Sequence, residues 1–279
     1  MELTKLRLPL LSFALMGLMA CESAEQQAPP PAPKEEEKEM DLADANQMLR
    51  EMPSPIEMAI LVKHSGGAYD PDLLNPIKNL DNYVASGKKA MNLGVYSADV
   101  GYTTLYKQTQ ETILFMNNIR KLSDAIGLSD AFDQSTFDRV EANIENRDSL
   151  LHIITGAYQV SNDYLKENNR LNTSILIISS GWLESMYLAS KLDGEEGQMV
   201  QVSARIAEQS IVLEKLVNAM ALIPNDPTVA EFQGKLAALL IEFNKEVLVT
   251  GDEENLVVNE ARMAEIYAEI DIIRAWMIT

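Results

Sequence analysis

The sequence predicts an all-α fold, an antiparallel bundle of about seven to nine helices. Apolar residues recur at spacings of three and four along most of the chain, and no segment shows a convincing strand alternation. Aromatic residues make up only 6% of the chain, whereas Leu, Ile, Ala and Met are plentiful, as is typical of helical bundles. Stacked helical hairpins are the alternative, but the consensus of tetratricopeptide repeats is absent.

The periodic segments predict the helices in chain order. They are 53–63, 76–92, 97–126, 137–158 with an interruption at Arg147 or Asp148, 162–191, 198–222, 227–248 and a last helix from about 255. Prolines lie near the starts of the first two segments and at Pro227, where Asp226 precedes it as a start signal. Gly127 and Gly251 follow helix ends. The short polar breaks predict antiparallel neighbours within one domain, 41–279.

Small residues interrupt two of these patterns. Ser179-Ser180-Gly181 lies in the middle of 162–191, where it allows close helix packing or a bend. Gly94 is expected to end the helix over 76–92 in a left-handed cap, so that the next helix starts near Tyr96.

A cluster of tyrosines around one carboxylate is the most unusual internal feature. Tyr96, Asp99, Tyr102 and Tyr106 fall at helical spacings that place them close together. Aromatic rings beside a carboxylate suit a sugar or a peptide, so these four are weak candidates for ligand binding. The alternative is ordinary packing at a crowded helix junction, with the hydroxyl groups hydrogen-bonded inside the protein.

The N-terminal residues have the layout of a lipoprotein signal peptide. Lys5 and Arg7 precede an apolar run that is shorter than the roughly 20 residues of a membrane-spanning helix. The run ends in Leu18-Met19-Ala20-Cys21, which resembles a lipobox, and Cys21 is the single cysteine of the chain. We expect residues 1–20 to be a signal peptide and Cys21 to be the site of lipid attachment. A buried structural cysteine is the alternative.

A tether is expected between Cys21 and the helical domain. Residues 21–40 contain four prolines, many charges and no apolar periodicity. Such a segment cannot bury enough surface to offset its ordering entropy, and its prolines favour an extended spacer. Acidic residues soon after the cysteine also resemble export signals of surface lipoproteins in the Bacteroidetes, although a solvating linker explains them equally well.

Signals for metal, cofactor or nucleophilic chemistry are absent from the sequence. The two histidines, His64 and His152, do not belong to a ligand motif, although Asp148 and His152 share a helix face. We therefore expect no metal, no cofactor and no catalytic residues. The formal charge of −19 argues against nucleic acid as a partner and favours cationic or basic ones.

Three parts of the sequence carry a family resemblance: Asn75-Pro76, the approach from Ser86 to Gly94, and the tyrosine stretch that follows it. Together they resemble uncharacterised helical lipoproteins of the Bacteroidetes over roughly the first half of the mature domain. The resemblance implies a helical fold and an envelope location, and it implies no activity.

We expect a cell-envelope protein, anchored by lipid in the outer membrane, on its periplasmic or surface face. Its helical domain is expected to be a non-enzymatic binding or scaffold module with an envelope protein as a possible partner. The alternative is an enzyme that acts on cell-wall, glycan or peptide material, in which Asp99 converges with other polar groups in a deep pocket.

Overall fold

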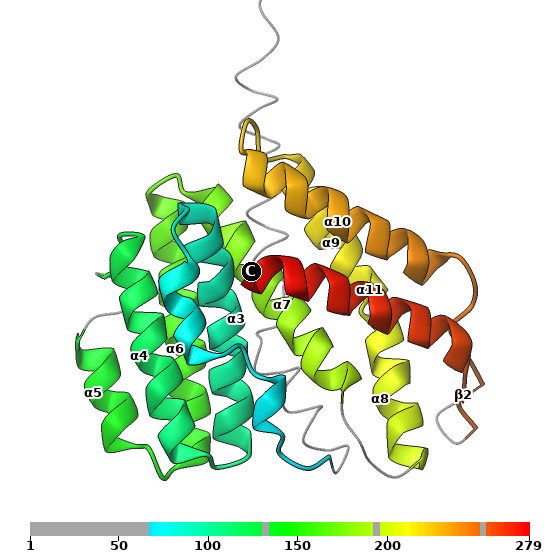
Figure 1. The fold of residues 1–279 in the computed structure, drawn as a ribbon, viewed down its shortest axis with the longest axis horizontal. Helices are drawn as coiled ribbons and strands as arrows, with labels where there is room; N and C mark the ends of the chain where they lie inside the picture. Colours follow the sequence, from blue (N-terminus) through cyan, green and yellow to red (C-terminus); the bar gives the residue numbers. More distant parts are fainter. Residues whose placement is uncertain (1–66, 130–133, 192–195, 252–254) are drawn as a thin grey trace, which may run out of the picture. The chain divides into compact units, whose positions relative to one another are not determined.

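The computed structural model describes residues 67–129, 134–191, 196–251 and 255–279, all within one compact unit of the chain (Figure 1). In these residues it has nine α-helices, two short 3-10 helices and one pair of two-residue strands, so the predicted all-α bundle is confirmed. The expected signal peptide, Cys21, the tether, the helix over 53–63 and His64 lie outside the described residues.

The elements follow one another with short connections. The 3-10 helices are η1 (Pro71–Leu73) and η2 (Ile77–Asn82). The α-helices are α3 (Ser86–Leu105), α4 (Thr109–Ala125), α5 (Gln134–Ala142), α6 (Arg147–Glu167), α7 (Leu171–Ser190), α8 (Glu196–Glu208), α9 (Ser210–Ala221), α10 (Pro227–Asn244) and α11 (Glu260–Ile278). Strands β1 (Val249–Thr250) and β2 (Val257–Val258) connect α10 to α11.

Helices α3 and α7 form the centre of the bundle. They pack against each other along their lengths, and nearly all side chains between Ala90 and Leu105 and between Ser174 and Ala189 are buried. Helices α4 and α6 pack against this pair on one side, with α5 against α6, while α8 to α11 lie on the other side (Figure 1). Because both central helices are covered all round, they carry few charged residues.

Gly94 does not end a helix, which corrects the expected left-handed cap. Helix α3 continues through it, because Gly94 is the point at which α3 meets α7. A Cβ atom at this position would lie 2.2 Å from the carbonyl oxygen of Ile177 and 2.2 Å from Oγ of Ser180. The small residues in the middle of α7 therefore serve close packing, one of the two roles expected for them.

Several other boundaries differ from the sequence prediction. The expected 162–191 helix divides at Asn169, which has a φ of 56°, and the expected 198–222 helix divides at Gln209. The true break after α3 lies at Lys107, with a φ of 59°, rather than near Tyr96. In each case apolar residues continue at helical spacing across the turn, because both flanking helices face the same core.

The start of α10 and the end of α4 were predicted correctly. Oδ1 of Asp226 accepts hydrogen bonds from the backbone N–H groups of Thr228 (2.9 Å) and Val229 (3.1 Å), and Pro227 follows at the first helical position. Gly127 has a φ of 69° just after α4. Both signals act within a few residues, and at these two positions the tertiary contacts agree with them.

The small hairpin after α10 was not expected. Val249 pairs with Val258 and Thr250 with Val257, antiparallel, and Gly251 has a φ of 95° at the turn. Two-residue strands are too short to show an alternating pattern in a sequence. The hairpin delays the last helix to Glu260 and brings residues after α10 against α8.

The α3–α7 contact can be tested by the Gly94→Ala substitution. In an open helix this change stabilises, because alanine has the better helix propensity by about 1 kcal/mol. Here we expect destabilisation by about 1–3 kcal/mol from overpacking, measured by chemical denaturation. The matched control is Gly234→Ala in α10, where a Cβ meets no atom within 4 Å and stabilisation is expected. Equal effects at the two positions would contradict the close packing.

Candidate functional site

The four residues of the expected tyrosine platform lie in the interior or at its edge. The hydroxyl of Tyr96 donates to the Pro76 carbonyl oxygen (3.1 Å), and the hydroxyl of Tyr102 accepts from the Asp70 N–H (3.0 Å). The hydroxyl of half-buried Tyr106 donates to the Gly67 carbonyl oxygen (2.6 Å). The rings therefore fasten residues 67–76 onto α3 instead of forming an open surface, which matches the packing alternative.

Asp99 is completely buried in the centre of the bundle. Its Oδ2 accepts a hydrogen bond from the backbone N–H of Asn75 at 3.2 Å. Its Oδ1 is buried and accepts no hydrogen bond from the residues that the structure describes. Burial of a charged carboxyl oxygen without a hydrogen bond costs free energy of folding. The cost is smaller when the carboxyl group carries a proton, because the group is then neutral.

Two further charged residues complete the cluster, and the sequence analysis did not identify them. Glu184 of α7 is fully buried, and Arg274 of α11 is 8% exposed. Nε of Arg274 lies 2.9 Å and 3.1 Å from the two carboxylate oxygens of Glu184, and Nη2 lies 2.9 Å from Oε1. Nη2 also donates to the carbonyl oxygen of Leu73 at 2.7 Å. One guanidinium thus joins α7, α11 and the chain before α3.

The cluster holds two carboxyl groups and one guanidinium. Burial, reinforced by the neighbouring Glu184 carboxylate, raises the pKa of Asp99 well above its usual range. Burial also raises the pKa of Glu184, against the opposing effect of Arg274. Although burial alone lowers the pKa of Arg274, the Glu184 carboxylate raises it above its usual value. We therefore assign the negative charge to Glu184, which Arg274 pairs, and a proton to Asp99.

Asn75 extends the cluster into a polar network that reaches the end of the chain. Its side-chain amide donates to Oη of Tyr83 and to Oδ1 of Asn92, both at 3.0 Å. The Asn92 amide in turn donates to the carbonyl oxygen of Met277 at 3.0 Å. The network therefore joins α3 and α11 through the residues before α3, and a buried polar network of this kind makes one packing arrangement specific.

The buried position of Glu184 has a signal in the sequence. Glu184 is the single charged residue of α7, and Asp99 is the single charged residue in the second half of α3. A lone charge in an otherwise apolar and small-residue helix predicts a buried partner. The identity of that partner does not follow, because Arg274 lies 90 residues beyond Glu184.

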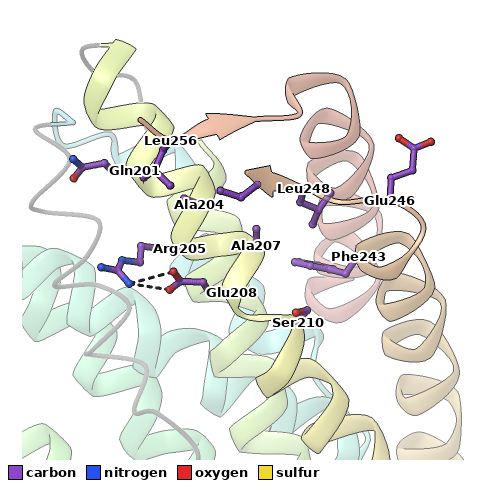
Figure 2. A pocket seen from close by; sticks show the side chains of 11 residues that line it. Gln201, Ala204, Arg205, Ala207, Glu208, Ser210, Phe243, Glu246, Leu248 and Leu256 are labelled. Carbon is purple, nitrogen blue, oxygen red and sulfur yellow. Dashed lines mark hydrogen bonds and ion pairs between the residues drawn. The ribbon is translucent and has the colours of Figure 1, made fainter. Parts of the chain in front are cut away.

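A cavity of about 580 Å³ lies elsewhere, between α8, the end of α10 and the hairpin (Figure 2). Its volume is within the range of small-molecule sites. Its apolar lining comes from the alanines of α8, from Phe243 of α10 and from the chain around the hairpin. The lining residues are Gln201, Ala204, Arg205, Ala207, Glu208, Ser210, Phe243, Glu246, Leu248, Val249 and Leu256.

The polar groups of this cavity lie at its edge and are largely engaged. Nη1 of Arg205 lies 2.9 Å from a carboxylate oxygen of Glu208, and both side chains are more than half exposed (Figure 2). Glu246 is exposed and accepts from the Asn259 amide at 3.5 Å. The buried carboxyl groups of Asp99 and Glu184 do not line the cavity. A lining that mixes apolar and polar groups suits the binding of a ligand with an apolar part and a polar part.

Comparison of the chain with protein-family models, with curated proteins and with solved structures gives no match. The functional proposal therefore depends on the cavity, the buried cluster and the sequence signals. Within the described residues, no group of His, Cys, Asp and Glu side chains is placed to hold a metal ion. Asp148 is exposed and pairs with Arg147 at 2.8 Å. None of the described helices is both long and apolar enough to span a bilayer.

Arg274→Met tests the charge balance of the buried cluster. It leaves two buried carboxyl groups without a cation, so Glu184 must also be protonated in the folded state. We expect a loss of about 3–5 kcal/mol in the free energy of unfolding at neutral pH. Because the folded state then binds more protons than the unfolded state, the loss should grow as the pH rises above the unfolded-state pKa of about 4. Denaturant titrations at pH 5 and pH 8 measure both effects.

The control is Arg262→Met on the same helix. Arg262 is as buried as Arg274, but its partners Glu242 and Glu265 reach solvent, with side chains 25% and 60% exposed. Their carboxylates can be hydrated when the guanidinium is removed, so we expect a smaller loss that does not grow with pH. Equal losses at pH 5 and pH 8 for Arg274→Met would contradict the assigned charges.

Proposed function

We propose that this chain is a cell-envelope protein, anchored by lipid at Cys21, whose helical domain is a non-enzymatic binding module. The observation that carries the binding role is the cavity beneath the hairpin. Apolar and polar groups share its lining, and Phe243 and Leu248 in its wall are almost fully buried. A ligand or a partner side chain with an apolar surface gains free energy by entering it, at about 25 cal/mol per Å² of apolar area buried.

The placement of the carboxyl groups favours binding over catalysis. General acid–base chemistry needs a titratable group within hydrogen-bond reach of the substrate. Asp99 and Glu184, the groups with raised pKa, are fully buried and engaged with each other, Arg274 and Asn75. The carboxylates at the cavity, Glu208 and Glu246, are exposed, and Glu208 is ion-paired. The cavity therefore offers shape and apolar surface.

The sequence supports the anchor. The basic start, the short apolar run and the lipobox pattern before Cys21 agree with one another, and the proline-rich residues 21–40 suit a spacer between a membrane and a domain. A protein with more than one acyl chain is attached stably to a membrane, and lipoprotein processing adds more than one chain to the cysteine. We place the protein at the outer membrane by its resemblance to lipoproteins of the Bacteroidetes.

Cys21→Ala tests the anchor. In cells fed a labelled fatty acid, the natural chain should incorporate the label and sediment with membranes. The variant should incorporate none and appear in the soluble fraction, because the thioether-forming sulfur is gone. Ser23→Ala, two residues beyond the cysteine, is the control and should behave as the natural chain does. Label in the Cys21→Ala variant would refute the attachment site.

A photo-crosslinking amino acid at position 246 tests the cavity. Placed in the exposed position of Glu246 at the cavity edge, it should form an adduct in intact cells. Ala207→Phe, which fills the cavity from α8, should abolish that adduct because it removes the space for the ligand. Ala230→Phe, at an exposed position of α10, is the matched control and should leave the adduct unchanged. Thermal unfolding checks that both variants fold.

Two results would contradict the binding role. One is an adduct from position 246 that Ala207→Phe leaves intact, because binding would then lie outside the cavity. The other is turnover of cell-wall, glycan or peptide material that the same substitution abolishes, because the cavity would then be an active site. A crosslinker at exposed Glu141 of α5, remote in sequence from the cavity-lining residues, should give no adduct.

A further inference from the structure

The residues before α3 cover the buried carboxyl pair. We call residues 67–85 the strap. Its 3-10 helices η1 and η2 contain no buried residues, and its buried side chains of any size are Leu74, Asn75 and Tyr83. Its other apolar side chains, Tyr69, Leu73, Ile77 and Leu80, are only partly buried against the core. An element with this partial burial opens more readily than the fully buried helices beneath it.

Hydrogen bonds hold the strap, and the charge cluster supplies the innermost of them. The backbone N–H of Asn75 donates to Oδ2 of Asp99 at 3.2 Å, and Arg274 donates to the carbonyl oxygen of Leu73 at 2.7 Å. The tyrosines of α3 hold its outer part, at Gly67, Asp70 and Pro76. The strap thus closes directly over the side chain that must keep a proton.

We propose that Asp99 is a proton-controlled latch: while it carries its proton the strap is closed, and loss of the proton favours opening of the strap. A second negative charge beside the Glu184 carboxylate has no cation of its own, because Arg274 already pairs with Glu184. Removal of the strap lets water reach Asp99 and relieves both the desolvation and the repulsion.

The groups around Asp99 support the assignment. They come from every element packed against it: Glu184 from α7, Arg274 from α11, Tyr69, Asn75 and Tyr83 from the strap, and Tyr96 from α3 itself. Burial raises the pKa of each of these tyrosines, so they stay neutral. Asp99 is therefore the group whose proton the closed and open states hold with different strength. The raised pKa of Asp99 agrees in direction with this geometry.

The sign of the effect follows from proton linkage. The closed state holds a proton that the open state loses above about pH 4, the ordinary pKa of an aspartate. Opening therefore becomes more favourable as the pH rises from that value towards the raised pKa of the closed state, by up to about tenfold per pH unit.

Opening of the strap also lengthens the tether of the anchored protein, a consequence that rests on the proposed function. The strap follows directly on the residues that lead to Cys21, so its release adds up to about 60 Å of extended chain between the membrane and the bundle. The latch itself does not depend on the anchor or on the cavity, and it is testable in the purified protein.

Hydrogen exchange of the purified protein, read by mass spectrometry and corrected for intrinsic exchange rates, tests the latch. Between pH 5 and pH 8 we expect the protection of residues 67–85 to fall tenfold or more and, at each pH, to remain below that of α10. In Asp99→Asn, whose amide can donate to Glu184 and accept from Asn75 without a proton to lose, protection of the strap should not change with pH. Unchanged strap protection in the natural chain, or the same fall in the variant, would overturn the proposal.

A second measurement keeps the test decisive if Asp99→Asn folds poorly. The infrared spectrum of the natural chain at pH 7 should contain the carbonyl band of a protonated carboxyl group, and this band should weaken as the strap opens at higher pH. Absence of that band at pH 7 would overturn the proposal without any variant.

Discussion

Two carboxyl groups and one guanidinium, all buried, constrain the whole structure. Asp99, Glu184 and Arg274 belong to α3, α7 and α11; Arg274 pairs with Glu184, and the Glu184 carboxylate contributes to the raised pKa of Asp99. A buried ion pair adds little net stability, but the loss of one partner is costly, so such a cluster favours one packing arrangement over its competitors. The contact of α3 with α7, the position of α11 and the closure of residues 67–85 all meet at this point.

The central helices also explain how a bundle without a described disulfide or metal is held together. At Gly94 the backbone of α3 approaches α7 so closely that a single methyl group would collide with Ile177 and Ser180. Such close approach buries backbone and small side chains together. The hydroxyls of Ser180 and Ser185 donate to carbonyl oxygens of their own helix, at 2.7 Å to Leu176 and 2.8 Å to Gly181. The larger apolar side chains then fill the space on either side of the pair.

The proposed binding cavity and the buried charge cluster are separate. The cavity beneath the hairpin is built from α8, the end of α10 and the chain around the hairpin. The buried cluster sits between α3, α7 and α11 and is covered by residues 67–85. Because the two are separate, the residues of the cavity can vary without disturbing the charge balance of the buried cluster. For the same reason, a change in the protonation of Asp99 can act on residues 67–85 without changing the lining of the cavity.

The sequence by itself determined the features that depend on neighbouring residues. The helical class follows from periodicity, the start of α10 from Asp226 and Pro227, and the end of α4 from Gly127, because capping and turn preferences act within one helical turn. The proposed anchor at Cys21 is equally local and remains a prediction. Only the tertiary structure decided that Gly94 is a contact instead of a cap, that Asp99 is buried in the centre of the bundle, and that Arg274 is the partner of Glu184. Those outcomes depend on residues up to 90 positions apart, which no local pattern connects.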